Sequence, residues 1–311
     1  MKTCIIGSGS WSLALTKIFK ENNILIKCRD INKTSKSFQN TKIKLTTKFS
    51  DLSASKYIFL AIPSQTIRNN LKLLKKQCYR KDSVFIICSK GVEKKTNKLM
   101  SEVVNDFFPS HKVVILSGPN FSNELISNKP SASVLSSKNK SVLLDVSGLL
   151  SQKKFRIYFN NDIIGTQLGG AMKNVIAIAC GLIKGKNIGE NARAAIITRG
   201  MSEIVQLGLK MGAKRNTFYG LSGIGDLTLT CSSMRSRNTR FGYEIAKGQN
   251  LYKLKKKCVL EGIESCESIC NLGKLHTVEL PLCNAVKKII QGVEVDKVIS
   301  DLLSRPLQFE K

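Results

Sequence analysis

The chain has few of the residue types that mark metal-binding or base-stacking proteins. Its 311 residues include two histidines, one tryptophan and only 6% aromatic residues. The ten cysteines form no Cys-x-x-Cys pair, and the two histidines, His111 and His276, lie far apart. Cys266 and Cys270 share a helix face, but this composition argues against a zinc site. We therefore expect no metal, and free buried thiols in a reducing compartment.

Long apolar runs are also missing. No run approaches the roughly 20 residues that a membrane helix needs. The N-terminus leads directly into Gly-Ser-Gly-Ser and does not have the pattern of a signal peptide. We therefore expect a cytoplasmic protein without a membrane span. The length and the hydrophobic fraction of 42% suit two domains with sizeable cores.

Acidic residues are scarce, with 22 against 50 basic ones, so that the formal net charge is +28. Such a charge suits nucleic acid, a membrane surface or an anionic substrate. The lysines are spread along the chain, and there are few aromatic residues to stack on bases. We therefore expect a solvated lysine-rich surface and no nucleic-acid partner. A nucleotide-bound protein that binds nucleic acid remains the alternative from a different class.

The first 30 residues have the pattern of strand, glycine turn, helix and strand. Lys2–Ile6 is apolar, Gly7-Ser8-Gly9-Ser10-Trp11-Ser12 follows, and a helical pattern runs over Leu13–Phe19. Gly7 allows a tight turn, and Gly9 lets the backbone approach a pyrophosphate at the helix N-terminus. Ser12, a small residue, replaces the third glycine. The pattern predicts binding of NAD or NADP.

Two charged residues follow the next expected strand, Ile24–Cys28. Asp30 lies about 20 residues after the glycine turn, where an acidic residue holds a ribose hydroxyl. Arg29 beside it suits a 2′-phosphate. A solvated loop pair is the alternative, so the sequence does not settle NAD against NADP, and we predict use of both.

Strands and helices alternate as far as residue 160, which predicts a mostly parallel sheet covered on both faces. Ligands bind beyond the carboxyl ends of such strands. Ser64, Lys90 and Gly118-Pro119 all lie at those ends. The further expected strands are Tyr57–Ile62, Val84–Cys88, Val113–Leu116, Ser131–Leu135 and Phe155–Tyr158.

After Asn160-Asn161-Asp162 the strand pattern stops and helical periodicity takes over. We therefore predict a dinucleotide-binding domain over residues 1–160 and a helical domain over residues 161–311. The expected helices are Ile163–Leu182, Ala192–Met211, Ile224–Cys231, Thr239–Lys247, Glu264–Leu272, Pro281–Ile290 and Val295–Leu303.

The segment Gly169–Gly181 is apolar on nearly all helical faces, which indicates a buried helix. Lys173 and Asn174 interrupt it, and no carboxylate one turn away pairs with the lysine. Burial of a lone ammonium lowers its pKa, so Lys173 is a candidate proton donor. A lysine that extends to the surface is the equal alternative.

Two polar clusters follow in the helical region. Gly220–Asp226 is a glycine-rich approach to a helix with a carboxylate near the helix start, and a first-turn aspartate is the alternative interpretation. Ser236-Arg237-Asn238 precedes the next helix and has the residue types of a phosphate site. A capped helix with an exposed arginine is the alternative.

With these residues assembled, the chain resembles the bacterial NAD(P)-dependent glycerol-3-phosphate dehydrogenases, nearly end to end. The resemblance implies a Rossmann-like α/β domain followed by an all-α domain, in the 6-phosphogluconate dehydrogenase-like build. The motifs that carry it are Gly7–Trp11, Ser89–Gly91, Ser117–Pro119, Gly170–Asn174, Asn191–Gly200, Gly225–Leu227, Thr230-Cys231 and Ser236–Asn238.

The resemblance implies hydride transfer between NAD(P) and the glycerol 3-phosphate/dihydroxyacetone phosphate pair, which supplies phospholipid synthesis, in a homodimer. A ketopantoate reductase-like enzyme is the alternative in the same build. Lys173 would accept the proton in the oxidative direction, with Lys90 and Asp226 beside it. The implied substrate contacts are Lys90, Gly118, Asn120, Lys173, Asp226, Ser236, Arg237 and Asn238. The cofactor contacts expected from the motif and the resemblance are Gly7, Gly9, Ser10, Trp11, Arg29, Asp30, Lys90, Ser122, Arg237, Val259 and Glu261.

The sequence departs from the family pattern at several of these positions. Ser12, Asn120 and Ser122 stand where the family usually has Gly, Ser and a small residue. Asp30 stands where a basic residue is common, which bears on the preference for NADP. Asn120 keeps an amide that suits a substrate oxygen.

Overall fold

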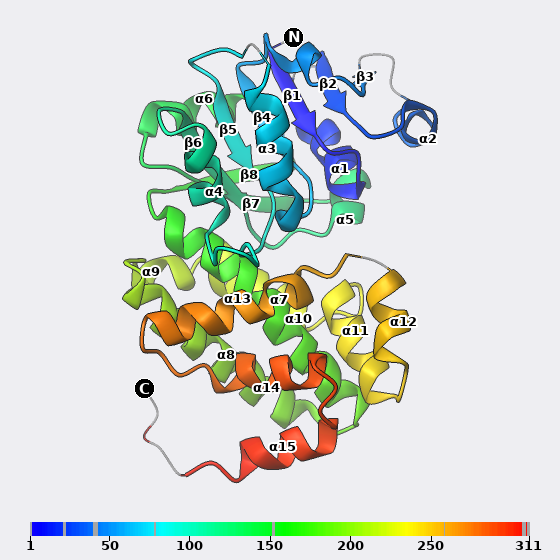
Figure 1. The fold of residues 1–311 in the computed structure, drawn as a ribbon, viewed down its shortest axis with the longest axis vertical. Coiled ribbons are helices and arrows are strands. Elements are labelled where there is room, and N and C mark those ends of the chain that lie inside the picture. The colour runs from blue at the N-terminus through cyan, green and yellow to red at the C-terminus, as the bar shows by residue number, and fades with distance from the viewer. Residues whose placement is uncertain are drawn as a thin grey trace. The chain divides into compact units, whose positions relative to one another are not determined.

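The computed structural model describes residues 2–20, 23–39, 43–77, 79–150, 153–257, 259–306 and 309. The chain forms two compact units (Figure 1). Unit 1 comprises Met1–Lys90 and Lys98–Ile163, and unit 2 comprises Gly91–Asn97 and Ile164–Lys311. The short segment Gly91–Asn97 therefore packs with the second unit, although the sequence analysis placed it in the first region.

Unit 1 is built on one eight-stranded sheet in the order β3-β2-β1-β4-β5-β6-β7-β8. All neighbouring strands are parallel except β6 and β7, which run antiparallel. The expected mostly parallel sheet is thus confirmed, and β3 is a strand that the sequence analysis missed. The strands are β1 (Thr3–Ile6), β2 (Ile24–Lys27), β3 (Ile43–Thr46), β4 (Tyr57–Leu60), β5 (Val84–Ile87), β6 (Lys112–Ser117), β7 (Ser131–Ser136) and β8 (Phe155–Asn160).

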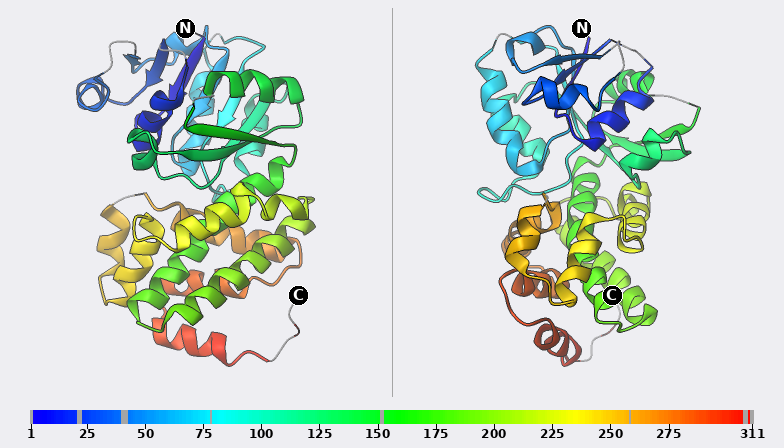
Figure 2. Two further views of the ribbon diagram at one scale, coloured as in Figure 1. Left: turned by 180° about the vertical axis from the view of Figure 1, so that it is seen from behind. Right: turned by 90° about the vertical axis from the view of Figure 1, so that its right-hand side faces the viewer.

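Both faces of this sheet are buried because helices cover each of them (Figure 2). Alternate residues of one strand enter different cores: Phe59 packs with α1, α5 and α6, whereas Ile58 and Leu60 pack with α3 and α4. A parallel sheet requires such two-sided burial. The helices are α1 (Ser10–Ile18), α2 (Ile31–Ser35), α3 (Ile67–Lys75), α4 (Met100–Phe107), α5 (Ser122–Ile126) and α6 (Lys140–Leu150), with 3₁₀ turns at η1 (Ser50–Leu52) and η2 (Ser64–Thr66).

In the described part of unit 2 the regular elements are all helical, as expected. One difference is that Ile224 lies in a π turn, so that the expected helix from Ile224 begins at Asp226. The elements are α7 (Ile163–Gly185), α8 (Glu190–Lys210), α9 (Arg215–Phe218), η3 (Leu221–Gly225), α10 (Asp226–Cys231), α11 (Arg237–Ala246), α12 (Leu251–Lys257), α13 (Glu261–Leu275), α14 (Pro281–Ile290) and α15 (Val295–Leu303).

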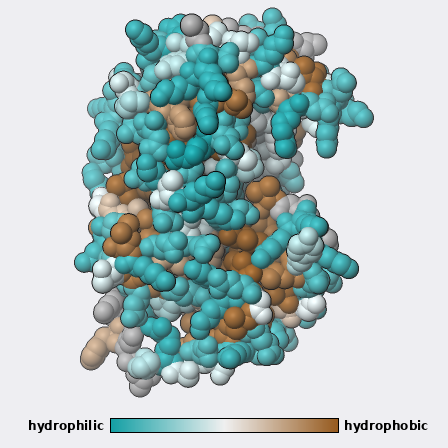
Figure 3. Space-filling view, in the orientation of Figure 1, coloured by the Kyte–Doolittle hydropathy of each residue, from teal (hydrophilic) through white to brown (hydrophobic). Residues whose placement is uncertain are grey.

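Helix α7 is the core element of unit 2. By length and composition it is also the one helix among the described residues that would suit a membrane span, which the sequence analysis did not single out. Yet 89% of its apolar window is buried inside the protein. The face of the molecule in Figure 3 shows hydrophilic side chains over most of its area, as the lysine-rich composition leads one to expect.

Helices α7 and α11 cross with their backbones in contact. A Cβ atom on Gly181 would lie 2.0 Å from the carbonyl oxygen of Thr239, and one on Gly242 would lie 2.0 Å from that of Ile178. No side chain fits there, since carbonyl groups inside helices cannot rotate away. The two glycines therefore set the distance between these helices.

We predict that Gly242→Ala lowers the free energy of unfolding by about 3 kcal/mol or more, because the helices must separate to admit one methyl group. Gly148→Ala in α6 is the matched control. Gly148 is also helical, but its Cβ would have nothing within 4 Å. That control should gain about 0.5–1 kcal/mol. Urea unfolding measures both, and an equal response of the two variants would contradict the close crossing.

A buried carboxylate joins two other helices of unit 2. Glu203 of α8 is 5% exposed, and its two oxygens accept hydrogen bonds from the backbone N–H groups of Leu282 (2.5 Å) and Cys283 (3.2 Å) at the start of α14. Burial raises the pKa of Glu203 to about 7, although the same hydrogen bonds act to lower it. The folded protein therefore keeps this proton at pH values where the unfolded chain has lost it.

We predict that stability falls as pH rises from about 4.5 to 7, because the folded state holds the Glu203 proton and the unfolded state does not. The contribution lost over this window is about 3 kcal/mol, and the loss is complete above pH 7. Glu203→Gln cannot titrate, so its free energy of unfolding should depend less steeply on pH. The free energy of unfolding of each protein is measured by urea titration between pH 5 and 7.5. An equal dependence on pH in the wild type and in Glu203→Gln would count against the raised pKa.

Candidate active site

The glycine turn of unit 1 has the geometry that a pyrophosphate site requires. Gly7 has φ +118°, and a Cβ there would lie 2.4 Å from the carbonyl oxygen of Ala61. A Cβ on Gly9 would meet nothing within 4 Å, so the backbone borders open space. Helix α1 begins at Ser10 without a side-chain cap and without an acidic residue in its first turn. These features fit a dinucleotide phosphate at the helix N-terminus.

Ser10 and Trp11 form the first turn of α1, and Ser12 behind them is fully buried. A small residue at position 12 thus allows the close packing for which the fingerprint normally uses glycine. The indole ring of Trp11 is partly buried against the core that contains α1. The one tryptophan of the sequence therefore lies directly beside the glycine turn.

Arg29 and Asp30 follow β2 and are both exposed. Asp30 is the N-cap of α2, where its Oδ1 accepts a hydrogen bond from the backbone N–H of Lys33 at 3.0 Å. The hydroxyl group of Thr34 lies 3.4 Å from that of Ser8 in the glycine turn. The loop after β2 is therefore ordered next to the turn and is more than a solvated pair of charges.

Lys90, Gly118 and Asn120 come together beyond the ends of β5 and β6. The Lys90 ammonium donates a hydrogen bond to the carbonyl oxygen of Gly118 at 3.0 Å. The Asn120 amide donates to the carbonyl oxygens of Pro119 (2.9 Å) and Ala132 (3.0 Å), and its oxygen accepts from Ser133. The amide of Asn120 is thus used to hold its own loop, which the sequence analysis did not expect. Ser122 is the first residue of α5, directly after this loop.

In unit 2, Lys173 lies in the centre of α7 and is 8% exposed. Its ammonium donates hydrogen bonds to Asp226 Oδ1 at 2.5 Å and to Thr230 Oγ1 at 2.7 Å. The premise of a lone ammonium is therefore wrong, because helix α10 supplies the carboxylate that α7 lacks. The alternative of a lysine that extends to solvent is also wrong, since the ammonium ends in this buried cluster.

Helix α10 orients both partners of Lys173. Asp226 and Thr230 are one turn apart, and the Thr230 hydroxyl donates its hydrogen to the backbone carbonyl of Asp226 at 2.7 Å. Its oxygen is thereby turned to accept from the ammonium. The sequence analysis did not select Thr230, although its spacing of four residues from Asp226 was a usable signal.

The predicted phosphate cluster lies at the start of α11. Ser236 is the N-cap, and its oxygen accepts from the backbone N–H of Thr239 at 3.2 Å. Arg237 is exposed as the first helical residue. The helix is thus capped and the arginine is exposed, as in the alternative interpretation. A helix N-terminus of this kind is also suited to bind an anion.

The side chain of Asn238 points inward from the same turn. It is 8% exposed, donates to Asn174 Oδ1 at 3.0 Å, and accepts from the backbone N–H of Gly262 at 3.2 Å. It therefore links α11 to α7 and α13, so that a contact with substrate would come from its backbone. Asn174 is a further polar residue that was not among the predicted site residues. Val259 is 45% exposed, and Glu261 is the first residue of α13.

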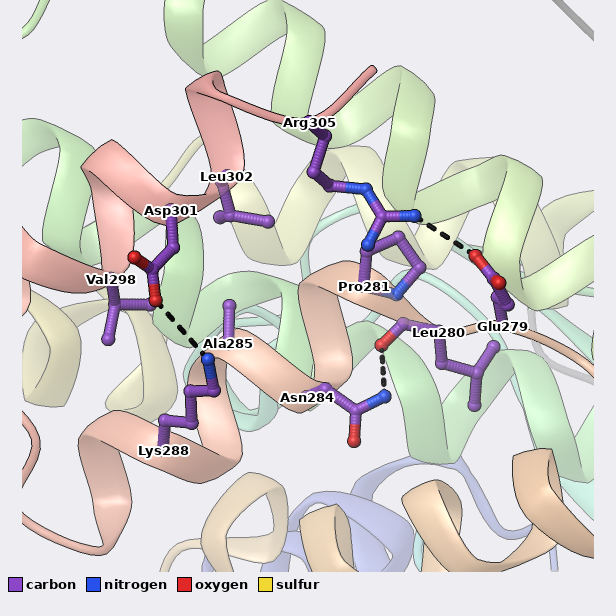
Figure 4. Close-up of a pocket in the computed structure, with 10 residues that line it drawn as sticks. All are labelled: Glu279, Leu280, Pro281, Asn284, Ala285, Lys288, Val298, Asp301, Leu302 and Arg305. Atoms are coloured by element: carbon purple, nitrogen blue, oxygen red, sulfur yellow. Dashed lines mark hydrogen bonds and ion pairs between the residues drawn. The ribbon is translucent and has the colours of Figure 1, made fainter. Parts of the chain in front are cut away.

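A separate cavity of about 280 Å³ lies by α14 and α15 (Figure 4). Ion pairs join Lys288 to Asp301 at 3.3 Å and Arg305 to Glu279 at 3.0 Å among its lining residues. None of the predicted site residues lines it. Within the described ranges there is also no group of three His, Cys, Asp or Glu side chains that could hold a metal ion.

Comparisons with known proteins agree with these features along nearly the whole chain. Residues 2–143 match the family model described as NAD-dependent glycerol-3-phosphate dehydrogenase N-terminus, and residues 162–300 match that of the C-terminus. Together the two models span both units of the fold.

Individual relatives carry the same name. A glycerol-3-phosphate dehydrogenase [NAD(P)+] of Clostridium perfringens is 36% identical over 100% of this chain and 99% of its own, and one of Zymomonas mobilis is 36% identical over 98% and 94%. The crystal structure of the glycerol-3-phosphate dehydrogenase from Coxiella burnetii has a TM-score of 0.92 at 28% identity, and covers 97% of this chain and 98% of its own. The chain therefore belongs to the NAD-dependent glycerol-3-phosphate dehydrogenase family.

Proposed function

We propose that this protein interconverts dihydroxyacetone phosphate and sn-glycerol 3-phosphate with NAD(P) as the hydride carrier. The observation that carries the proposal is the buried cluster of Lys173, Asp226 and Thr230 in a chain of this family. Residues 1–160 bind the dinucleotide, and residues 161–311 bind the substrate. The product supplies phospholipid synthesis in the cytoplasm.

The reduced nicotinamide, when bound, supplies the hydride that reaches C2 of the ketone. Lys173 holds the carbonyl oxygen, stabilises the negative charge that develops there, and then donates its proton to give the hydroxyl group. Asp226 and Thr230 hold the ammonium in position. Lys90 adds positive charge nearby. In the oxidative direction Lys173 accepts the proton.

The phosphate group of the substrate binds at the start of α11. Arg237 pairs with it, and the Ser236 hydroxyl and the backbone N–H groups of the first turn, including that of Asn238, donate hydrogen bonds. Gly118 and Asn120, in the loop after β6, border the carbon skeleton of the substrate. These contacts orient the ketone and take no part in proton transfer.

Both cofactors are used, because the loop after β2 offers a group for each. Asp30 binds a ribose hydroxyl of NAD, and Arg29 binds the 2′-phosphate of NADP. Gly7, Gly9, Ser10 and Trp11 hold the pyrophosphate. The remaining cofactor contacts are Lys90, Ser122, Arg237, Val259 and Glu261.

We predict a homodimer assembled through residues 161–311, where apolar side chains such as Ile188 and Ile224 are 44% and 37% exposed. Burial of such surface between two copies stabilises an assembly. Sedimentation should give a species of twice the 34.4 kDa chain mass. A single 34.4 kDa species at working concentration would rule the dimer out.

We predict that the wild-type protein oxidises NADH and NADPH with dihydroxyacetone phosphate, and that Lys173→Met lowers kcat by roughly a hundredfold or more. Methionine keeps the apolar length but has no proton to donate. Cofactor affinity should change little, and quenching of Trp11 fluorescence by NADH measures it without turnover.

Lys184→Met is the matched control, since Lys184 lies on the same helix and is exposed. Lys173→Met leaves Asp226 buried without its cation, so Lys173→Met/Asp226→Asn, which removes both charges, guards against a folding defect. Near wild-type turnover in a folded Lys173→Met protein would disprove the mechanism. Turnover with ketopantoate alone would disprove the substrate.

A further inference from the structure

The segment Gly91–Asn97, which we call the strap, follows Lys90 directly and packs on α13 within unit 2. The backbone N–H of Val92 donates to Ser265 Oγ at 3.0 Å, and Ser268 Oγ donates to the carbonyl oxygen of Glu93 at 3.0 Å. Both serines are fully buried on α13. Two serine hydroxyls one turn apart on one helix thus bind consecutive residues of the strap.

Further contacts hold the rest of the strap against the same helix. Lys94 forms an ion pair with Glu264 at 2.7 Å, and Asn271 Nδ2 donates to Asn97 Oδ1 at 3.4 Å. Val92 is fully buried, and Glu93 is 5% exposed. The strongest attachment, with buried hydrogen bonds to backbone, therefore lies at the end of the strap next to Lys90.

The residue before Lys90 is anchored within unit 1. The hydroxyl group of the preceding residue, Ser89, donates to the carbonyl oxygens of Leu60, the last residue of β4, and of Ile62. The lysine itself lies between this anchor and the strap, and its ammonium donates to Gly118. Hydroxyl groups that bind main-chain atoms thus lie on both sides of Lys90 along the chain, that of Ser89 within unit 1 and that of Ser265 within unit 2.

We propose that Ser265 and Ser268 are positioning residues for Lys90, which act by fixing the strap to α13. The proposal rests on the proposed function, in which Lys90 contacts the substrate. The same helix starts at Glu261 and is bonded through the Gly262 N–H to Asn238. Helix α13 therefore connects the strap to Asn238 in the first turn of α11.

The test is a double-mutant cycle of Ser268→Ala with Lys90→Ala, read as kcat/KM for dihydroxyacetone phosphate. Alanine removes one buried hydrogen bond to the strap, so Ser268→Ala should lower kcat/KM by about fivefold. With Lys90 already removed, the same change should have no further effect, because the strap then has no lysine to position. An equal loss in both backgrounds would overturn the proposal.

Asn271→Ala is the matched control on the same helix. It removes the bond to Asn97, at the far end of the strap from Lys90, and should leave kcat/KM within about twofold of wild type. Ser265→Ala should resemble Ser268→Ala, since Val92 is two residues from Lys90. The proposal would also be overturned if the loss of kcat/KM in each variant followed its loss of stability and not the distance of the removed contact from Lys90.

A second measurement separates failure of this proposal from failure of the proposed function. The labelling rate of Lys90 by an amine-reactive reagent is read by mass spectrometry against Lys17, an exposed lysine of α1. Ser268→Ala should increase labelling of Lys90 relative to Lys17 even if no ketone is turned over. Unchanged labelling refutes the positioning role, whereas a wild-type protein without turnover refutes only the function.

Discussion

Direct backbone contact between α7 and α11 is the constraint on which unit 2 depends. Gly181 and Gly242 allow the two helices to touch, so that α7 is surrounded closely enough for even a lysine near its centre to be buried. That burial makes the carboxylate of Asp226 necessary, because a charge removed from water needs a partner. Packing and chemistry are linked here, since the buried ammonium of Lys173 on α7 pairs with the buried carboxylate of Asp226 on α10.

The large net positive charge can be divided into surface charges and a few cations at predicted site positions once the residues are placed. Most lysines belong to the solvated surface, whereas Lys90 and Lys173 are held by defined acceptors in their respective units. Arg237 lies exposed at a helix start, where the backbone also favours an anion. In the proposed function, a doubly charged phosphate ester is recognised by Arg237 and the first turn of α11 and not by the overall charge of +28.

Local patterns in the sequence were sufficient to predict the alternation of strands and helices, the glycine turn and the buried helix α7. They failed where the answer depends on distant segments. Asp226, the partner of Lys173 53 residues away, was predicted from the family resemblance and not from a local pattern, and the groups that hold Asn120 and Asn238 come from other elements. Strand β3 is half-exposed and has only two strongly apolar residues, Ile43 and Leu45, so its hydrophobic pattern was weak. Thr230 was missed because its role depends on the hydrogen bond that it accepts from Lys173, 57 residues away.

The strap also bears on how the chain is made. Val92 and the serine that binds it are 173 residues apart, so the strap leaves the ribosome long before α13 exists. The N-terminal part of a chain generally begins to fold first during synthesis. Strands β5 and β6, on either side of the strap in the sequence, can pair early. The strap itself stays an open loop until α13 has been synthesised. Completion of the protein is therefore a late, long-range event, and a chain truncated before residue 265 would carry an unsatisfied loop beside Lys90.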